Sequence, residues 1–262
     1  MGAQQKVMNI LMGAIVPVAV ITAWEIASRD RLVSTFLLPP FSRVMERLWQ
    51  DLASGELFAL AGQTLLRLAI SYSIAVVAGV ALGILMARVR FVRWLLDPIV
   101  SIGFPAPKIA FLPIFILWFG VFDAPKIIMS IVSCIFPIIA GTWAGTQSVD
   151  KYLIWSAENL GASRRELLWQ VIFPAALPQV LTAMQVALPI AFIVVIVAEM
   201  LTGGGGLGGS MIEGARLADS ARVYTNLIVI GLIGFACLGL LQFVRRKILA
   251  WHPEVLQQKP GK

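Results

Sequence analysis

Long apolar runs, separated by short polar connectors, follow one another along the chain. A helix needs about 20 mostly apolar residues to cross the hydrocarbon layer of a membrane. The pattern therefore predicts an all-α bundle with six transmembrane spans, at residues 7–24, 68–87, 99–121, 127–145, 175–198 and 227–244. We expect the third span to be broken or bent, because it contains Pro105, Pro107, Lys108 and Pro113.

The amino-acid composition also indicates a membrane protein. Of 262 residues, 59% are hydrophobic and 13% are charged, and the mean hydropathy is +0.87. Soluble domains carry about 25% charged residues, so much of this apolar surface must face lipid. We expect one membrane domain over residues 1–262, with a core at 60–247, a cytoplasmic connector at 150–174 and a tail at 248–262. The first span is expected to be a retained anchor, because Glu25 stands where signal-peptide cleavage needs a small residue.

The distribution of charge predicts the orientation of the chain. The net charge is +7, from 21 basic and 14 acidic residues. With the N-terminus in the cytoplasm, the inner segments hold twelve basic and five acidic residues, and the outer segments hold nine of each. Basic residues concentrate on the cytoplasmic side of membrane proteins, so we expect both termini there. Their scatter argues against nucleic-acid binding, and a terminal cluster is expected to anchor lipid headgroups: Arg245, Arg246 and Lys247.

Few residues are suited to metal or nucleotide chemistry. A metal site is not expected, because Cys134 and Cys237 are better interpreted as packing residues and His252 as a surface histidine. The tail that follows His252 is expected to be disordered after residue 254. Three glycines match Gly-x-Gly-x-x-Gly, but a membrane helix precedes them where a dinucleotide site needs a strand. We expect Gly203, Gly205 and Gly208 to form a turn at which the chain either re-enters the membrane or packs closely beneath a binding protein.

Small residues recur at four-residue spacing in two of the spans. They are Ala75, Gly79 and Gly83 in the second span, and Gly141 and Gly145 in the fourth. Such ridges let helix backbones approach closely in a membrane, where lipid supplies no hydrophobic drive for association. We therefore expect compact helix packing at these positions.

The connector between the fourth and fifth spans carries helix-capping signals. Asp150 is suited to begin a helix over residues 151–160, and Gly161 is suited to end it. Ser163, with Glu166 three residues later, forms a capping box for a second helix. The pattern predicts two short cytoplasmic helices at an angle, held between two membrane spans.

A stiff connector of this kind can transmit a displacement that a flexible loop cannot. We expect a bend into the fifth span at Pro174 and Pro178, although a proline can also lie in the first turn of a helix. The side chains expected to face a partner are Glu158, Asn159, Arg164 and Arg165. Those expected to pack beneath the bundle are Leu160, Leu167, Leu168 and Val171. An ordinary amphipathic elbow at the membrane interface explains the same pattern without a partner.

The connector resembles the coupling motif of ABC importer permeases, which reads Glu-Ala-Ala, three residues, Gly, nine residues, Ile-x-Leu-Pro. The same spacing here joins Trp155-Ser156-Ala157, Gly161 and Val171-Ile172-Phe173-Pro174. Trp155 replaces the glutamate, so a contact made by that acid is not carried over. The resemblance to permeases of the nitrate/sulfonate/taurine type extends over most of the chain, including residues 36–48, 104–120, 160–178 and 198–209.

This resemblance implies a type I ABC importer permease of the bacterial inner membrane. It implies a homodimer that works with two ABC ATPases and an extracytoplasmic solute-binding protein. The ATPases would bind ATP and magnesium, whereas this chain has no Gly-x-x-x-x-Gly-Lys-Ser/Thr loop and is expected to hold no catalytic residue, cofactor or metal. The residues implied to couple to the ATPase are Ser156, Ala157, Glu158, Asn159, Gly161, Ala162, Ser163, Arg164 and Pro174.

Charged residues inside spans are costly and therefore suggest a translocation path. Lys108 is the main candidate to meet an anionic solute, although a loop position or snorkelling to an interface would also explain it. Glu199 is a second candidate, with tethering of the glycine turn as its alternative role. Trp118 and Phe119 either line a gate or anchor the chain at the interface. Arg67 is expected to be an interfacial anchor.

The function expected from these features is ATP-driven import of a small anion, such as a sulfonate, taurine or nitrate, by alternating access. A stand-alone secondary transporter or channel is the alternative, but the spans largely lack the carboxylates that ion coupling needs. An integral membrane enzyme would need a cluster of His, Asp or Glu, for which one histidine gives little support.

Overall fold

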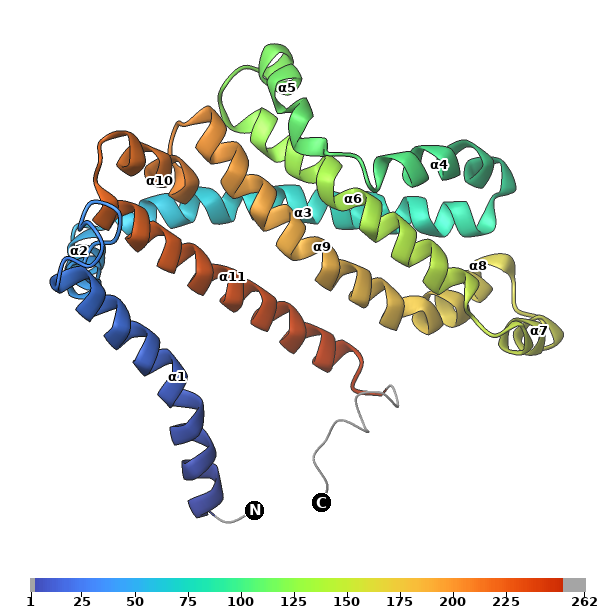
Figure 1. Ribbon diagram of the computed structural model, residues 1–262. Helices are drawn as coiled ribbons and strands as arrows, with labels where there is room; N and C mark the ends of the chain where they lie inside the picture. The colour runs from blue at the N-terminus through green and yellow to red at the C-terminus, as the bar shows by residue number, and fades with distance from the viewer. Residues whose placement is uncertain (1–2, 252–262) are drawn as a thin grey trace.

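The computed structural model describes residues 3–251, with side chains from residue 15 onward; His252 and the remainder of the tail lie outside the described residues. All regular structure in the described part is helical (Figure 1). The helices are α1 (Ala3–Arg29), α2 (Phe41–Ala53), α3 (Glu56–Arg88), α4 (Arg90–Gly103), η1 (Lys108–Phe111), α5 (Leu112–Phe119), α6 (Asp123–Gln147), α7 (Lys151–Asn159), α8 (Arg164–Glu166), η2 (Leu167–Ile172), α9 (Phe173–Thr202), α10 (Gly206–Arg216) and α11 (Ser220–Ile248).

The expected spans correspond to helices of this fold. Among the described residues, four helices are long and apolar enough to cross a membrane: α3, α6, the continuous helix Arg164–Thr202, and α11. A fifth crossing is formed if the bent pair of α4 with η1 and α5 counts as one span. Helix α1 contains the first expected span, residues 7–24. The second span was placed too short, because α3 begins at Glu56 rather than near residue 68.

The third span is broken, as the prolines predicted. Helix α4 and the segment Lys108–Phe119 meet at an angle of 95°. Pro105 and Pro107 lie in the break, where they cannot donate the backbone hydrogen bonds that would continue α4. The first residue after the break is Lys108, which begins the single turn η1.

Helices α3, α6 and α9 form the centre of the bundle, and small residues let them approach. A methyl group at Gly83 of α3 would lie 2.6 Å from the Thr142 Cβ of α6. A methyl group at Gly145 of α6 would lie 2.6 Å from the Gln179 Cβ of α9. Both distances are shorter than van der Waals contact, so the predicted ridges are confirmed as helix-packing positions.

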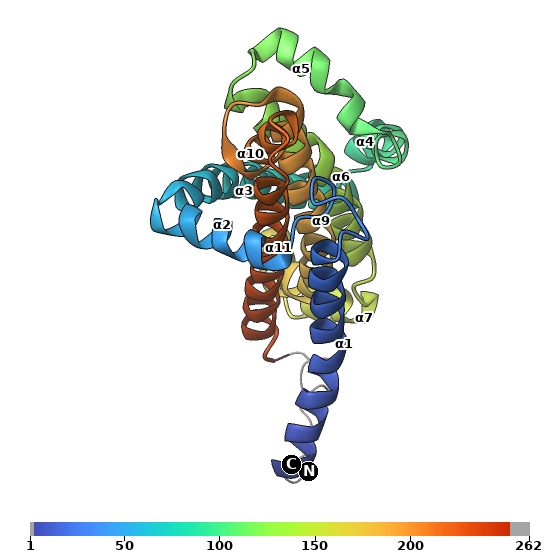
Figure 2. The same ribbon diagram turned by 60° about the vertical axis from the view of Figure 1, so that its left-hand side comes forward.

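Helix α1 is attached to the rest of the chain by its C-terminal end. The Trp24 Nε1 donates to the Pro39 carbonyl at 2.8 Å, and the Ser28 hydroxyl donates to the Leu38 carbonyl at 2.7 Å. Figure 1 shows the remainder of α1 diverging from the bundle, and apolar side chains such as Ile15 and Val16 are exposed along it. Figure 2 shows α2 lying across the end of the bundle that α1 reaches.

The two ends of the bundle carry different elements. The connector α7 lies at the end where α11 also finishes (Figure 1). Arg245, in the last turns of α11, donates to the side chain of Gln185, in the first half of α9, at 2.8 Å. The glycine turn, α2 and α10 lie at the opposite end.

Candidate functional site

The first half of the connector matches its capping signals. The Asp150 carboxylate accepts a hydrogen bond from the Tyr152 backbone N–H at 2.9 Å, so α7 begins at Lys151 as expected. Gly161 follows the helix with φ of +86°, a conformation that residues with a Cβ rarely adopt. The turn at this glycine changes the direction of the chain, as the sequence predicted.

The second half of the connector differs from the prediction. Ser163 and Glu166 do form a reciprocal capping box, in which the Ser163 N–H donates to the Glu166 carboxylate at 2.8 Å and the Glu166 N–H donates to the Ser163 hydroxyl at 3.3 Å. However, no separate short helix follows, because the chain continues as one helix from Arg164 to Thr202. Pro174 and Pro178 therefore do not interrupt this helix, and the place of Pro174 in the first turn of α9 agrees with the alternative that the sequence left open.

A π-helical turn explains why these prolines do not end the helix. The turn η2 lies directly before Phe173, and Pro174 occupies the first turn of α9. Proline lacks a backbone N–H, and the changed hydrogen-bond register of a π turn accommodates that loss without breaking the helix. The helix of the fifth span thus continues without a break to the capping box at Ser163.

The side chains of α7 project from the bundle. Tyr152, Leu153 and Trp155 are all exposed, and Leu160 is 88% exposed. The expectation that Leu160 packs beneath the bundle was wrong, because it lies on the turn at Gly161, away from α9. Leu167 is buried and Leu168 and Val171 are partly buried, as expected. The coupling candidates Ser156, Glu158, Asn159, Ser163 and Arg164 are exposed, and Ala157, Ala162 and Pro174 are partly buried.

The bent third span places Lys108 at its break and the aromatic pair Trp118 and Phe119 at the end of α5. Lys108 is half-buried at the break, and its Nζ donates to the Phe104 carbonyl at 2.8 Å. Trp118 and Phe119 are exposed at the end of α5, where each packs against the other and against Phe115. Lys108 therefore does not lie beside the two aromatic residues as part of one site.

An ion-pair cluster joins the first half of α3 to the start of α6 and the end of α9. The Arg67 Nη1 is 2.6 Å from a Glu199 carboxylate oxygen, and the Arg67 Nη2 is 2.7 Å from an Asp123 carboxylate oxygen. Arg67 and Glu199 are buried, whereas the Asp123 side chain is 62% exposed. The expectation that Arg67 is an interfacial anchor was wrong, because its guanidinium joins three helices inside the protein.

The same cluster holds the glycine turn. Glu199 accepts a hydrogen bond from the Gly208 backbone N–H at 3.0 Å and from the Thr64 hydroxyl at 3.0 Å. Lys126, which is 1% exposed, donates to the Gly203 carbonyl at 3.0 Å. Because φ is positive throughout Gly203–Gly206, the chain folds back over these charges and continues into α10. Glu199 therefore tethers the turn, as one of its two expected roles required.

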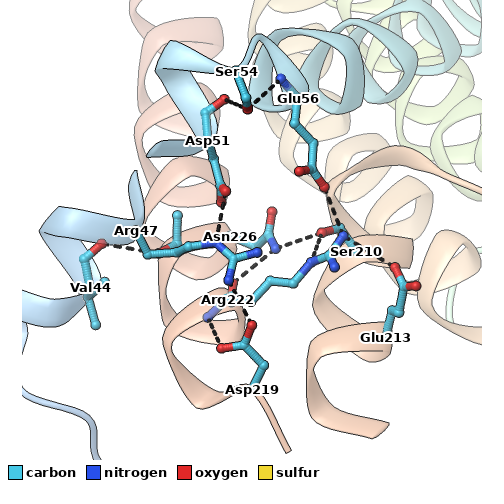
Figure 3. A network of polar contacts seen from close by, with 11 residues as sticks. Val44, Arg47, Asp51, Ser54, Glu56, Ser210, Glu213, Asp219, Arg222 and Asn226 are labelled. Atoms are coloured by element: carbon cyan, nitrogen blue, oxygen red, sulfur yellow. Dashed lines mark hydrogen bonds and ion pairs between the residues drawn. The ribbon is translucent and has the colours of Figure 1, made fainter. Parts of the chain in front are cut away.

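A second polar network joins α2, the start of α3, α10 and α11 at the same end (Figure 3). Arg47 of α2 lies 2.8 Å from both Asp51 and Asp219. Arg222 of α11 lies 3.0 Å from Glu56 and 3.3 Å from Glu213. These contacts hold α2 against the turn between α10 and α11 at this end of the bundle.

Sequence reasoning did not assign Lys126, Thr64 or Asp123 to a site. A usable signal was present, because charged residues stand at the ends of three of the apolar runs, 68–87, 127–145 and 175–198. Charges at the edges of spans are common, however, and the pairing of Arg67 with Glu199 joins residues 132 positions apart.

Comparison with known proteins identifies the family of this fold. Residues 79–250 match the family described as "Binding-protein-dependent transport system inner membrane component". The chain belongs to this family. It is therefore an inner-membrane permease, a membrane subunit of an ABC transporter rather than an enzyme.

Relatives of this permease share nearly the full length of the chain. The taurine transport system permease protein of Escherichia coli (strain K12) is 31% identical over 240 residues, covering 90% of this chain and 87% of that protein. The putative aliphatic sulfonates transport permease protein of the same organism is 32% identical over 247 residues, covering 90% of each. A putative aliphatic sulfonates permease of Bacillus subtilis (strain 168) is 27% identical and covers 92% of this chain and 88% of that protein.

Solved structures share the fold. A chain of the MetNI methionine ABC transporter, in inward-facing conformations, matches with a TM-score of 0.66 at 19% identity, over 73% of this permease and 95% of that chain. A chain of an amino acid ABC transporter matches with a TM-score of 0.59 at 16% identity, over 76% of this permease and 97% of that chain. The fold is that of a type I ABC importer permease, and the function is that of the transmembrane subunit of an ATP-driven importer.

Proposed function

We propose that this permease imports a small organic or inorganic anion, of the kind represented by sulfonates, taurine and nitrate. In this proposal two copies of the chain form the pathway, two ABC ATPases dock on the cytoplasmic connector, and a solute-binding protein delivers the solute from outside. The whole chain acts as one permease unit, with both termini in the cytoplasm. The names of the taurine and sulfonate relatives support this solute class.

The observation that carries the proposal is the geometry of the connector. Helix α7 is capped at Asp150, turns at Gly161 and joins a continuous helix that crosses the membrane. Its exposed aromatic and leucine side chains form an apolar surface that a partner can bury. The continuous helix that follows the turn at Gly161 can transmit a displacement to the bundle. The coupling residues proposed from the family resemblance, from Ser156 to Arg164, lie on and beside this exposed surface.

The opposite end suits contact with a solute-binding protein. An open cavity of about 670 Å³ lies there, lined by α2, the segment before it, and the turn between α10 and α11. The polar network around Arg47 and Arg222 holds these elements together (Figure 3), so a protein docked there would meet a fixed surface. In this arrangement the glycine turn lies close to the docked protein.

ATP chemistry belongs to the partner in this proposal. The sequence lacks a Gly-x-x-x-x-Gly-Lys-Ser/Thr loop, which supports assigning ATP and magnesium to the ATPase. Trp118 and Phe119, exposed at the end of α5, are proposed to face the gate of the pathway. Lys108 is proposed to face the solute, and Glu199 is proposed to act by holding the outer ends of the helices together.

The connector is tested by replacing Gly161 with valine. A β-branched residue at φ of +86° is strained, although no atom lies within 4 Å of the added Cβ, so the turn should change while the bundle remains intact. We expect loss of ATPase co-purification and of solute-stimulated ATP hydrolysis. The matched control is Gly55→Val, which has φ of +80° and equal free space but lies between α2 and α3. Unchanged co-purification and hydrolysis in Gly161→Val would refute the proposal.

A further inference from the structure

A cavity of about 360 Å³ lies where the break in the third span meets α6 and α9. Lys108 and Ser133 are the polar side chains in its lining, and none of its lining residues is acidic. The rest of the lining is apolar and includes Ile190, Ile193 and Val194 of α9. The cavity therefore combines one positive charge with an aliphatic wall.

The cavity opens on the side of the bundle, because Phe104 and Ile193 in its lining are 50% and 60% exposed, and it lies far from both ends of α6. Ser133 is ten residues from the first residue of α6, which corresponds to about 15 Å along the helix axis. It is fourteen residues from the last residue of α6, or about 21 Å. Anything bound beside Ser133 is thus near the middle of this membrane-spanning helix.

Lys108 has no carboxylate partner within the part of the chain that the structure describes. Its Nζ donates to the backbone carbonyls of Phe104 at 2.8 Å and Ala106 at 3.4 Å, and lies 5.4 Å from the centre of the Phe136 ring. An ammonium group has three protons to donate, and these contacts supply only partial negative charge. A cation midway along a membrane-spanning helix is costly without a counter-ion, so an anion bound beside Lys108 in the cavity would be stabilised.

We propose that this cavity is the membrane binding site for the solute, and that it selects a short-chain alkanesulfonate. The sulfonate oxygens accept a hydrogen bond from the Lys108 Nζ, and the alkyl chain packs against Ile190, Ile193 and Val194. The inference rests on the proposed import function and names the substrate class within it.

The lining distinguishes an alkanesulfonate from the other anions considered. Taurine carries an ammonium group at the end opposite its sulfonate, and the cavity presents no carboxylate to pair with it, so its burial there is costly. Nitrate has no apolar part to bury. Each methylene group buried against the aliphatic wall should strengthen binding roughly fourfold.

The test measures binding to the full-length permease without its ATPase. The purified protein is placed in nanodiscs of phosphatidylcholine and titrated by calorimetry with ethanesulfonate, butanesulfonate, taurine and nitrate. We expect butanesulfonate to bind most tightly, with a gain of roughly fourfold for each methylene over ethanesulfonate. Equal affinity for taurine and butanesulfonate would overturn the proposed selectivity.

Two variants test the role of Lys108. Lys108→Met keeps the length of the side chain and removes its charge, and should weaken butanesulfonate binding at least about tenfold. Lys108→Arg keeps the charge and should retain most of the affinity, which separates loss of the charge from misfolding. The matched control Lys247→Met, at the end of α11, should bind like the unmodified protein. Unchanged binding in Lys108→Met would overturn the assignment.

A lipid headgroup could supply the same anion chemistry, and a second nanodisc separates the two sources. If phosphatidylglycerol in the disc abolished butanesulfonate binding, the cavity would be a lipid site and the inference would fail. Binding that persists supports a solute site. Because these measurements need no ATPase, a missing sulfonate site together with normal ATPase coupling would refute only this inference. Sulfonate binding without any ATPase coupling would refute the proposed function.

Discussion

The guanidinium of Arg67 lies 2.6 Å from the carboxylate of Glu199, and protein atoms enclose both side chains. Arg67 belongs to α3 and Glu199 to α9, so the pair joins two helices of the central packing. The pair also holds the glycine turn, because Glu199 accepts from Gly208 and Arg67 donates to the Gly205 carbonyl at 3.3 Å. The outer ends of these helices and the turn therefore form one connected unit.

Removing one partner of this pair should destabilise the permease strongly. Arg67→Met leaves the Glu199 carboxylate buried without its main counter-charge, which costs about 3–5 kcal/mol. We expect a marked fall in the thermal unfolding midpoint in detergent. The double variant Arg67→Met with Glu199→Gln removes both charges and should recover part of the loss, which gives a double-mutant cycle. Independent, additive effects of the two substitutions would show that the residues are not coupled.

The small residues between α3 and α6 should not tolerate a larger side chain. A Cβ at Gly83 would lie 2.6 Å from the Thr142 Cβ and 2.9 Å from the Ile139 carbonyl oxygen. Gly83→Leu should therefore force α3 and α6 apart and cost about 1–3 kcal/mol or more. Thermal unfolding measures the effect, with Gly231→Leu in α11 as control, because no atom lies within 4 Å of a Cβ there. Equal stability of the two variants would contradict the packing described here.

The capping box should control the local stability of the N-terminal turn of the long helix that contains the fifth span. Ser163→Ala removes the hydroxyl that accepts from the Glu166 N–H, at a cost of about 1 kcal/mol. Hydrogen exchange at the Glu166 amide should then rise by roughly fivefold. Ser101→Ala, an exposed serine of α4, should leave that amide unchanged. Unaltered exchange in Ser163→Ala would mean that the cap does not stabilise this turn.

Leu160 should contribute to ATPase binding without contributing to the stability of the permease. It is 88% exposed, so Leu160→Asp should change the unfolding free energy by no more than about 0.5 kcal/mol. If a partner buries it, loss of the side chain should weaken ATPase association by about tenfold or more, since a buried leucine contributes about 1.5–3 kcal/mol. Pull-down with the partner ATPase measures this. The control is Leu32→Asp, 75% exposed in the segment between α1 and α2, for which we expect no loss. Equal recovery of the ATPase with both variants would exclude Leu160 from the interface.

Local signals in the sequence predicted much of this fold. Each apolar run except the broken third lies in one helix. The caps at Asp150 and Ser163 and the turn at Gly161 formed as expected, because each depends on hydrogen bonds or backbone angles within a few residues. The ridge at Gly79 and Gly83 was also recognisable, since the spacing of small residues is a property of one helix. At Pro174 the sequence allowed either a bend or the first turn of a helix, and only the structure shows the π turn beside it, whose hydrogen-bond register lets the helix continue.

The sequence by itself determined the spans, the break at Pro105 and Pro107, the connector and the family resemblance. Only the tertiary structure placed Arg67 against Glu199, Lys126 against Gly203, and Lys108 at an aliphatic wall of α9. The physical reason is distance along the chain. A cap or a span is stabilised by neighbours within a few turns of the same helix. An ion pair or a cavity depends on how separate helices pack, and the spacing of residues along the chain does not specify that packing.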